Sequence, residues 1–477
     1  MLRIKMTGTV QLNVKRFKGT CIKEDKLLSI NNMPHAKSLP IIGTRLDFFA
    51  AGGGLRLHEY IDSRHKQLGN IFAERLAGSI ELVFISDPLL MKSLFINMEG
   101  KYPMHILPDP WVLYEKIYGS QRGLFFMNGE NWLHSRRILN KHLLKEGTEN
   151  WISVPVIKSV QDFVEKLKEK LNNGYKIENL ETELYRLSTN VLVSILLGEN
   201  SMQRSQHYDK MLSIFSESVK KIFQDTTKLY GWPVEWCQYF NLKVWRDFKD
   251  SVDLSLHLAK KMAFEMIKTK DQHSGLIHKL AQEDLEDEMI ARIVADFIIA
   301  AGDTTAYTAL WIFLLLSKNE DVVEEIRTKE YTVKNVIKEA MRLYPVAPFL
   351  TRILPKETAF GHYKLKQGTP IIASIYTSGR DEQNFSKPDM FLPYRWDRND
   401  PRRENIVNHI PSASLPFAMG TRSCIGKKIA QVQLTELVCQ VIKNFDIKCK
   451  NCKDVKALTS QVLVPDRHLE FDITVRK

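Results

Sequence analysis

A long apolar stretch in the second half of the chain limits what this protein can fold into more than any other feature. Residues 285–317 read LEDEMIARIVADFIIAAGDTTAYTALWIFLLLS, and the second half of this stretch is almost wholly apolar. A helix that is apolar on all sides has to be buried. The uncharged part, residues 304–317, has only 14 residues, whereas a bilayer needs about 20. We therefore expect a helix through the centre of a folded unit, with one acid, Asp303, inside it.

The rest of the chain indicates further helices and a smaller amount of strand. Apolar residues spaced three and four apart predict helices over 132–145, 155–171, 180–198 and 206–223. Residues 70–87 alternate apolar and polar side chains, as strands do, and short extended pieces follow around 350–376. With 44% hydrophobic residues and no linker-like tract, we predict a mainly α fold with a small β portion (α+β), forming a single domain over residues 31–477.

Basic residues dominate residues 1–30, where the first acid is Glu24. Such a start is typical of a mitochondrial transit peptide, and a disordered basic tail is the alternative. The segment has no long apolar run, so we expect neither a secretory signal nor a membrane anchor in it. Over the whole chain, 68 Lys and Arg oppose 56 Asp and Glu, which suits an anionic membrane or an acidic protein. No basic block interleaved with aromatic residues indicates a nucleic-acid partner.

One cysteine lies in an unusual setting, PFAMGTRSCIGKK, residues 416–428. Cys424 has Gly420 and Gly426 on either side and Arg422 two positions before it. Glycines let backbone amides come close to a sulfur atom, and a helix that begins just after the cysteine directs its positive end at the thiol. This setting favours an anionic sulfur that binds a metal, and a buried structural cysteine is the alternative.

The full pattern F-x-x-G-x-R-x-C-x-G, from Phe417 to Gly426, resembles the haem-binding loop of the cytochromes P-450, the haem-thiolate monooxygenases. Four further motifs of that family occur in the family's order: WLHSR, AAGDTT, KEAMR and FLPYRW. The resemblance implies the cytochrome P-450 fold. It also implies haem b between the central helix and the cysteine loop, with its iron ligated by the Cys424 thiolate.

The resemblance assigns further roles to residues at the matching positions. Phe417, Gly420 and Gly426 belong to the haem-binding loop. The residues that would hold the haem propionates are Trp132, Arg136, Arg352 and Arg422, with Arg137 as a rival for Arg136. A structural cluster beneath the haem would consist of Glu339, Arg342 and Arg395, of which the first two lie three residues apart on one helix face.

On the central helix, AAGDTT matches the oxygen-activating motif of the family and gives Asp303 and Thr304 the catalytic roles. A hydroxyl beside the oxygen and a carboxylate behind it form a relay for the protons that oxygen activation consumes. The alternative for Asp303 is an acid that only pairs with a neighbouring helix. Ala301 occupies the usual glycine position of the motif, and Gly302 follows it, so we expect the helix distortion of the family to be shifted.

The electron donor is indicated by basic residues on two segments. Lys334 and Lys338 precede KEAMR as in the mitochondrial branch of the family, and Lys427 and Lys428 follow the cysteine. The resemblance implies an acidic [2Fe–2S] ferredoxin with its NADPH-dependent reductase, which a positive face would attract. A solvated charged face is the alternative. The same branch implies a peripheral position on the matrix side of the mitochondrial inner membrane.

The stretch KLYGWPVEWCQYFNLKVWRDF, residues 228–248, lies where the family has a mobile lid. Its aromatic and basic residues suit contact with a membrane surface or packing in the core, two alternatives that the sequence leaves open. The stretches GLFFMNGENWLHSRRILNKHLL and FIIAAGDTTA resemble the arthropod ecdysteroid hydroxylases, most of all those acting on carbon 2. The resemblance therefore implies a steroid substrate, O2 as co-substrate and a role in moulting-hormone synthesis.

Two other functions remain as alternatives at this point. A haem-thiolate peroxide isomerase or dehydratase would not need Asp303, Thr304 or the basic residues. A non-catalytic haem sensor or carrier belongs to another class, and NADPH consumption with ferredoxin would separate it from an oxygenase. Cys449 and Cys452 form a C-x-x-C, but no second pair or nearby histidine completes a zinc site.

Overall fold

The computed structural model describes residues 27–76, 80–119, 123–198, 202–268, 270, 274–329 and 332–476, with backbone alone for 202–209. Most of the basic N-terminal segment, residues 1–26, lies outside the described residues, and so does the transit peptide expected there. Leu28 and Ser29 already pair in parallel with Tyr363 and Lys364. The paired structure thus begins slightly before residue 31, where we place the domain boundary.

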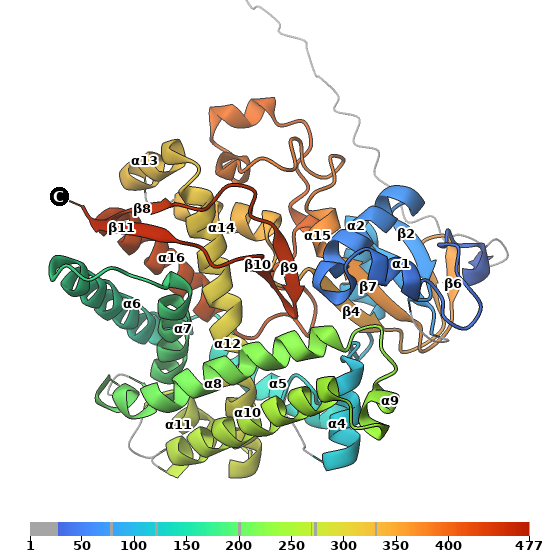
Figure 1. The fold of residues 1–477 in the computed structure, drawn as a ribbon, viewed down its shortest axis with the longest axis horizontal. Helices are drawn as coiled ribbons and strands as arrows, with labels where there is room; N and C mark the ends of the chain where they lie inside the picture. Colours follow the sequence, from blue (N-terminus) through green and yellow to red (C-terminus); the bar gives the residue numbers. More distant parts are fainter. Residues whose placement is uncertain are drawn as a thin grey trace, which may run out of the picture.

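Helices make up most of the described chain and form one body in Figure 1. They are α1 (Arg45–Ala50), α2 (Leu57–Leu68), α3 (Pro88–Ser93), α4 (Asp109–Tyr118), α5 (Gly129–Leu143), α6 (Glu149–Asn172), α7 (Leu180–Leu197), α8 (Met202–Lys228), α9 (Val234–Tyr239), α10 (Lys243–Lys268), α11 (Leu276–Ala281), α12 (Asp287–Leu316), α13 (Glu320–Thr328), α14 (Thr332–Leu343), α15 (Ile375–Ser378) and α16 (Lys427–Asn444). The helices expected from apolar spacing correspond to α5, α6, α7 and α8, which confirms those predictions.

The expected central helix is α12, which passes through the middle of the molecule in Figure 1. Two acids in its first turn, Asp287 and Glu288, complement the positive end of the helix dipole. The helix contacts α7, α8, α10, α14 and α16. In its second half, Trp311 stacks on Tyr344 at 4.0 Å between ring centroids and donates its indole N–H to the carbonyl of Leu463, so this large side chain is buried without an unpaired donor.

Among the described residues, α12 is the one helix long and apolar enough to cross a membrane, but 78% of its apolar window is buried inside the protein. A membrane-spanning helix would present that surface to lipid instead. The burial supports the expectation of a core helix in a large helical body.

Strands form a smaller part of the fold, mainly at the side of the molecule that carries α1 and α2 (Figure 1). They are β1 (Leu28–Ser29), β2 (Ile71–Glu74), β3 (Leu82–Ile85), β4 (Phe349–Ile353), β5 (Thr358–Phe360), β6 (Tyr363–Leu365), β7 (Pro370–Ser374), β8 (Phe445–Cys449), β9 (Ala457–Ser460), β10 (Val462–Pro465) and β11 (Phe471–Val475). The largest sheet has the order β2-β3-β7-β4. The pairs β2–β3 and β4–β7 are antiparallel and β3–β7 is parallel, with Val83 opposite Ile371.

This sheet joins two segments that lie far apart in the sequence, and it thereby brings β4 next to the segment that follows β3. The amide of Ile353 at the end of β4 donates to the carbonyl of Met104 over 2.9 Å. The mainly α fold with a small β portion is therefore confirmed, and the sheet places residues 99–105 beside β4.

Candidate active site at the cysteine loop

The cysteine loop, residues 414–426, connects a short 3-10 helix, η9 (Pro411–Ala413), to the N-terminus of α16. The backbone N–H of Cys424 donates to the carbonyl of Phe417 over 2.9 Å, which closes the loop. The side chain of Phe417 is half-buried and packs against the main apolar core. The loop is thus anchored at both ends, and Cys424 lies just before the first turn of α16.

The two glycines of this loop have different surroundings. Gly420 has a left-handed backbone with φ of 79°, and a Cβ there would lie 2.2 Å from the carbonyl oxygen of Phe95. Only glycine fits such a position. Gly426 has an ordinary φ of −83° and open space where a Cβ would lie. The approach of a backbone amide to the sulfur is therefore found at Gly426, whereas the glycine at position 420 allows close packing against the Phe95 carbonyl.

The Cys424 thiol is surrounded by protein, and yet its side chain keeps accessible surface. Burial raises the pKa of this thiol, while the N–H of Gly426 and the charges of Arg136 and Lys427 act in the opposite direction. Since burial dominates, the sulfur needs a further positive charge to become a thiolate. A metal ion bound at the sulfur would supply that charge in place of the proton.

Three guanidinium groups converge on the loop from different elements. Arg136 of α5 donates to the carbonyl of Ser423 over 2.6 Å. Arg422 lies in the loop itself, 4.3 Å above the ring of Trp132, and Arg352 of β4 is buried beside it. Arg137 is exposed, so Arg136 is the arginine of WLHSR that reaches this region.

Several N–H groups of these arginines have nothing to donate to. Among the described residues, Arg136 Nε and Arg352 Nη2 are buried without a hydrogen-bond partner. Arg422 donates to the carbonyls of Pro103 and Met127, each over 2.5 Å. Buried donors without partners are rare in folded proteins and indicate a missing acceptor.

Charge leads to the same conclusion. Burial lowers the pKa of Arg136 to about 10, and burial together with the charges of Arg352 and Arg136 lowers that of Arg422 to about 10. Glu99 is the carboxylate that opposes these three cations within the described part of the chain. The site is therefore left with excess positive charge, and a dianion with two carboxylates would offset it.

Glu99 is a residue of this site that the sequence did not reveal. It follows a π-helical turn, η4 (Leu94–Met98), and is 4% exposed. Its carboxylate accepts hydrogen bonds from Arg352 Nε over 2.8 Å and from the N–H and hydroxyl of Thr421 over 2.8 and 2.7 Å. Glu99 thus fixes both an arginine and the cysteine loop. Its partners lie 253 and 322 residues away, so no local pattern could identify it.

His105 is the second residue that the sequence analysis missed. Its Nε2 is buried without a hydrogen-bond partner among the described residues, and its ring lies 4.7 Å from that of Phe125. Burial, with the charges of Arg422 and Arg352, lowers its pKa to about 3. The imidazole is therefore neutral and can offer or accept one hydrogen bond beside the arginines.

We predict that Glu99→Gln weakens haem retention roughly tenfold to hundredfold, because the amide cannot replace a charged hydrogen-bond acceptor worth about 1.5–3 kcal/mol. The measurement is the rate of haem transfer from the purified protein to apomyoglobin. Glu146→Gln, at an exposed position, is the control and should release haem at the parent rate. Equal rates for both variants would show that Glu99 does not position the haem-binding groups.

The resemblance implies that a face of α12 forms the second side of the site. Within this mostly buried helix, Ala300 is exposed and Ala301 and Thr304 are half-buried. These residues lie one and four positions apart and so share one face. The hydroxyl of Thr304 donates to the carbonyl of Ala300 over 2.8 Å. This face of α12 therefore has room for a ligand, with one hydroxyl on it.

Asp303 points away from that face. It is 1% exposed, and its two carboxylate oxygens have no hydrogen-bond partner in the described part of the chain. Burial raises its pKa to about 7, with Lys220 lowering and Glu181 raising it. The structure thus places Asp303 and Thr304 on adjacent faces without a direct hydrogen bond. The α12 helix is continuous past Ala301, and the expected shift of a helix distortion stays a prediction.

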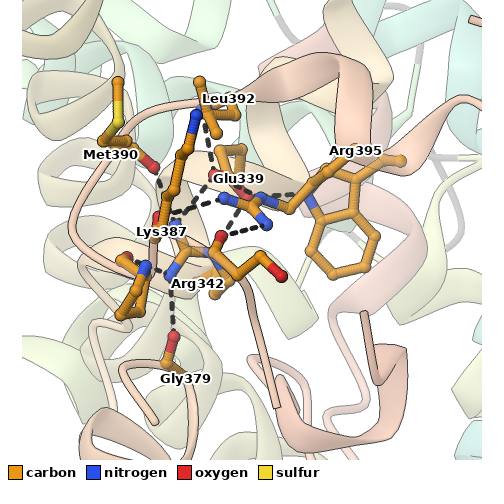
Figure 2. A network of polar contacts seen from close by, with 10 residues as sticks. Glu339, Arg342, Gly379, Lys387, Met390, Leu392 and Arg395 are labelled. Carbon is orange, nitrogen blue, oxygen red and sulfur yellow. Dashed lines mark hydrogen bonds and ion pairs between the residues drawn. The ribbon is translucent and has the colours of Figure 1, made fainter. Parts of the chain in front are cut away.

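The predicted cluster of Glu339, Arg342 and Arg395 is present and fully buried (Figure 2). Arg342 donates to both oxygens of Glu339 over 2.9 and 2.8 Å, and Arg395 Nε donates to Oε1 over 2.9 Å. The indole of Trp396 and the amide of Leu392 also donate to this carboxylate. The cluster therefore ties α14 to the irregular segment before the cysteine loop.

Burial alone would raise the pKa of Glu339, but the hydrogen bond and charge of Arg342 and the charge of Arg395 outweigh it and hold the pKa below its ordinary value. Arg342 also donates to the carbonyls of Gly379 and Pro388 over 2.7 and 2.6 Å. These hydrogen bonds hold the segment that contains Gly379 and Pro388 against α14 (Figure 2). The three charged side chains of the cluster are fully buried and paired with one another, as expected for a structural cluster.

The four lysines expected at the donor face differ in their surroundings. Lys334, Lys338 and Lys427 are exposed, and Lys338 lies 5.9 Å above the ring of Trp396. Lys428 donates to the carbonyl of Lys145 over 2.7 Å and forms an ion pair with Glu149. Three of the four therefore present their charge to solvent, whereas Lys428 joins α16 to the start of α6.

Some aromatic residues of the stretch 228–248 are packed in the core and others are exposed on the surface. Trp245 is 1% exposed and belongs to the core. Trp236, Tyr239 and Phe240, on and after α9, are 67%, 79% and 64% exposed. Exposed apolar side chains of this size, grouped on one short segment, mark a contact surface.

The cysteine loop, the arginines and the open face of α12 together define a site for an anionic metal cofactor bound through a thiolate. A family model for cytochrome P450 matches residues 33–472. The chain therefore belongs to the cytochrome P450 family. Members of this family are oxidoreductases that bind haem iron through a cysteine thiolate, and the unpaired buried donors and the excess positive charge of the site fit a haem with its two propionates.

Relatives that match over most of the chain include the following three. Cytochrome P450 315a1, mitochondrial, from Drosophila melanogaster is 37% identical and the match covers 97% of this chain and 92% of the relative. The mouse mitochondrial 1,25-dihydroxyvitamin D(3) 24-hydroxylase is 27% identical over 92% of this chain and 88% of its own length. The mitochondrial cholesterol side-chain cleavage enzyme of Hypanus americanus is 28% identical, with 85% and 83% covered.

Proposed function

We propose that this chain is a mitochondrial steroid hydroxylase that holds haem b through Cys424. The observation that carries the proposal is a pair of buried guanidinium groups with unpaired N–H donors, Arg136 and Arg352, and the half-buried Arg422, around a loop that presents one cysteine. Two relatives are named as acting on cholesterol and on a vitamin D derivative, which supports a sterol-like substrate. The similarity to a mitochondrial relative over 97% of the chain supports the organelle.

Each group in the site has a role in this proposal. Arg136, Arg352, Arg422 and Trp132 hold the propionates, and Phe417, Gly420 and Gly426 shape the haem-binding loop. The Cys424 thiolate would hold the haem iron, and the haem would supply the activation of O2. Thr304 presents a hydroxyl on the open face of α12, and Asp303 behind it stores a proton, since its pKa is about 7.

For the substrate, we propose an ecdysteroid precursor that is hydroxylated at carbon 2, as the sequence resemblance implies. The test is product analysis after turnover of the haem-loaded enzyme with NADPH, a mitochondrial ferredoxin and its reductase. A series of precursors that differ only in their hydroxyl groups should give one product each, with the new oxygen on carbon 2. If the new oxygen is on another carbon, the proposed position of hydroxylation is wrong, but the proposal of a steroid hydroxylase stands. Absence of turnover with any sterol would overturn the steroid proposal.

We also propose that electrons come from an acidic [2Fe–2S] ferredoxin that binds the face with Lys334, Lys338 and Lys427. Lys334 and Lys338 lie four positions apart on α14 and are both exposed, so they present their charges together. Lys428 contributes less to such a face because it is paired within the protein.

Charge reversal at this face should weaken the interaction with ferredoxin. For Lys334→Glu with Lys338→Glu, we expect the KM for ferredoxin to rise about tenfold or more at low salt, with the difference shrinking as salt screens the charges. Lys158→Glu with Lys166→Glu, on exposed positions of α6, is the charge-matched control. A KM that rises equally in both double variants would point to net charge alone.

The exposed aromatic residues of α9 support peripheral contact with the matrix side of the inner membrane. On α1, Leu46 is 59% exposed, and Phe49 lies 5.9 Å from Trp232 between ring centroids, so the apolar surface extends from α9 to α1. Aromatic side chains suit the membrane–water interface.

We predict that Trp236→Ser with Phe240→Ser lowers binding to cardiolipin-containing vesicles several-fold in a flotation assay, because two large exposed side chains no longer insert. Val407→Ser, at a position that is 89% exposed on another segment, is the control. Equal flotation of all forms would remove this patch as the membrane contact.

We further propose that residues 1–30 direct import into mitochondria and that residues 31–477 form the enzyme. The basic composition of the segment supports import. The size of the chain after uptake by isolated mitochondria tests this assignment.

A further inference from the structure

Asp303 lies against a group of polar side chains that the function proposed so far does not use. The group is located where α7 and α8 pack on α12. It consists of Glu181 and Tyr185 on α7, Lys220 on α8 and Tyr307 on α12. The pKa values of Asp303 and Tyr307 are affected by the charge of Glu181, and that of Tyr185 by the charge of Asp303. The five side chains therefore form one electrostatic unit.

Gly302 determines how closely Tyr185 approaches α12. A Cβ on Gly302 would lie 2.5 Å from the ring carbon Cζ of Tyr185 and 2.7 Å from its hydroxyl oxygen. A side chain at position 302 would thus displace the phenol. The motif AAGDTT has its glycine one position later than the family pattern, at Gly302. The Tyr185 hydroxyl therefore lies against the residue that directly precedes Asp303.

The Tyr185 hydroxyl is as short of partners as the Asp303 carboxylate. It is buried and makes no hydrogen bond within the described part of the chain; Ser216 lies near it, but outside hydrogen-bond geometry. Burial, with the charge of Asp303, raises its pKa far above the ordinary value for tyrosine, so the hydroxyl stays neutral and can both donate and accept. Both groups are buried and unpaired at the same part of α12, and such groups indicate a path that water or a small side-chain rotation completes.

The other end of the group reaches solvent. Glu181 accepts hydrogen bonds from Tyr307 over 2.9 Å and from Lys220 over 2.5 Å. The side chains of Glu181 and Lys220 are 22% and 27% exposed, and Lys220 Nζ lies 5.9 Å from the ring centroid of Tyr185. The ion pair therefore stands between bulk water and the buried phenol.

We propose that the Glu181–Lys220 pair and Tyr185 form the route by which solvent protons reach Asp303, with Tyr307 holding Glu181 in place. This inference rests on the proposed function, because it supplies the acid of the hydroxylase with protons. Each proton that the Asp303 carboxyl releases toward the Thr304 side is replaced by one that passes the Tyr185 hydroxyl. The pair regains that proton from water, so no group in the route is changed after a cycle.

The ion pair also sets the protonation of Asp303, which provides a test that needs neither substrate nor ferredoxin. Lys220 lowers and Glu181 raises the pKa of Asp303, which burial brings to about 7. We expect Lys220→Met to raise the midpoint of the Asp303 titration by about one pH unit and Glu181→Gln to lower it by about as much. The measurement is infrared difference titration of the haem-loaded protein, with the carboxyl band of Asp303 assigned by its loss in Asp303→Asn.

The neighbouring Lys221 is exposed, so Lys221→Met changes the net charge equally and should leave the midpoint in place. Midpoints that move in opposite directions in the Lys220 and Glu181 variants support the coupling. Midpoints that stay fixed, or that move in the same direction, overturn it, because a loss of packing has no reason to give opposite signs.

Tyr185→Phe tests the conducting step. It keeps the ring against Gly302 and removes only the hydroxyl, so we expect an unchanged haem content. The fraction of NADPH electrons recovered as hydrogen peroxide should rise several-fold, with a larger solvent deuterium isotope effect on product formation. Tyr175→Phe, at a position that is 68% exposed, is the control. An unchanged peroxide yield and an unchanged isotope effect in Tyr185→Phe would overturn the route. Absence of sterol turnover in the parent enzyme would instead count against the proposed substrate, and the titration result would still stand.

Discussion

Replacing Cys424 with alanine is expected to abolish the thiolate band in the carbon monoxide difference spectrum of the reduced, haem-loaded protein, and with it all hydroxylation. The family binds haem iron through a cysteine thiolate, and Cys424 lies in the loop that contains Arg422 and whose Ser423 carbonyl accepts a hydrogen bond from Arg136. Without the sulfur, the iron loses the ligand whose electron density favours cleavage of the O–O bond. Activity should fall below detection.

The same variant should still bind haem, because the arginines proposed to hold the propionates are not altered. We therefore expect a band near the position of haem with a neutral or histidine ligand, at reduced occupancy. Cys452→Ala, in the half-buried C-x-x-C position, is the matched control and should keep the thiolate band. A thiolate band that persists in Cys424→Ala would mean that another cysteine binds the iron and would remove the site assignment.

The part of the site that the sequence predicted consists of residues in short motifs. Glu339 and Arg342 lie three positions apart on one helix face, and their ion pair at 2.8 Å is a local contact. Gly420 could be identified because its neighbours in the loop follow a strict pattern. The need for glycine there, however, comes from a tertiary contact, the close approach of the Phe95 carbonyl. Patterns over a few residues fix local geometry, and here they also fixed the family.

What the sequence did not predict depends on contacts between distant segments. Glu99 and Thr421 meet across 322 positions, and Tyr185 meets Gly302 only because α7 packs on α12. The sequence also could not separate the buried from the exposed residues of the aromatic stretch. Trp245 is 1% exposed and Trp236 is 67% exposed, and the difference depends on which side of each helix faces the core. Burial of one side chain is a property of the whole fold, and a single sequence without that fold leaves both alternatives open.

Neutralising Glu339 is expected to destabilise the fold by about 3–5 kcal/mol, the usual cost of leaving buried charges without their partner. Glu339→Gln keeps the shape of the side chain but leaves Arg342 and Arg395, both fully buried, with a neutral acceptor. A loss of this size is a large share of the 5–15 kcal/mol that holds a typical domain together. Urea unfolding of the haem-loaded protein, followed by circular dichroism and Soret absorbance, measures the loss.

Arg402→Met is the control for surface ion pairs, because Arg402 pairs with Glu325 at 2.9 Å and with Asp400 at 2.6 Å through a side chain that is 44% exposed. Its expected cost is at most about 1 kcal/mol. The two variants thus separate the burial of a charge from the loss of an ion pair as such.

The pH dependence of the unfolding free energy separates a loss of charge at Glu339 from a purely steric defect. The pKa of Glu339 is below its ordinary value of 4.5 in the folded protein, so its ionisation stabilises the fold above that ordinary value. This contribution is lost as the pH falls through the folded pKa, where the parent carboxylate becomes protonated too. The difference in unfolding free energy between parent and Glu339→Gln should therefore be constant near neutral pH and shrink at acid pH. A difference that stays the same down to pH values well below 4.5 would mean that the charge of Glu339 does not hold the cluster together, and that its shape alone does.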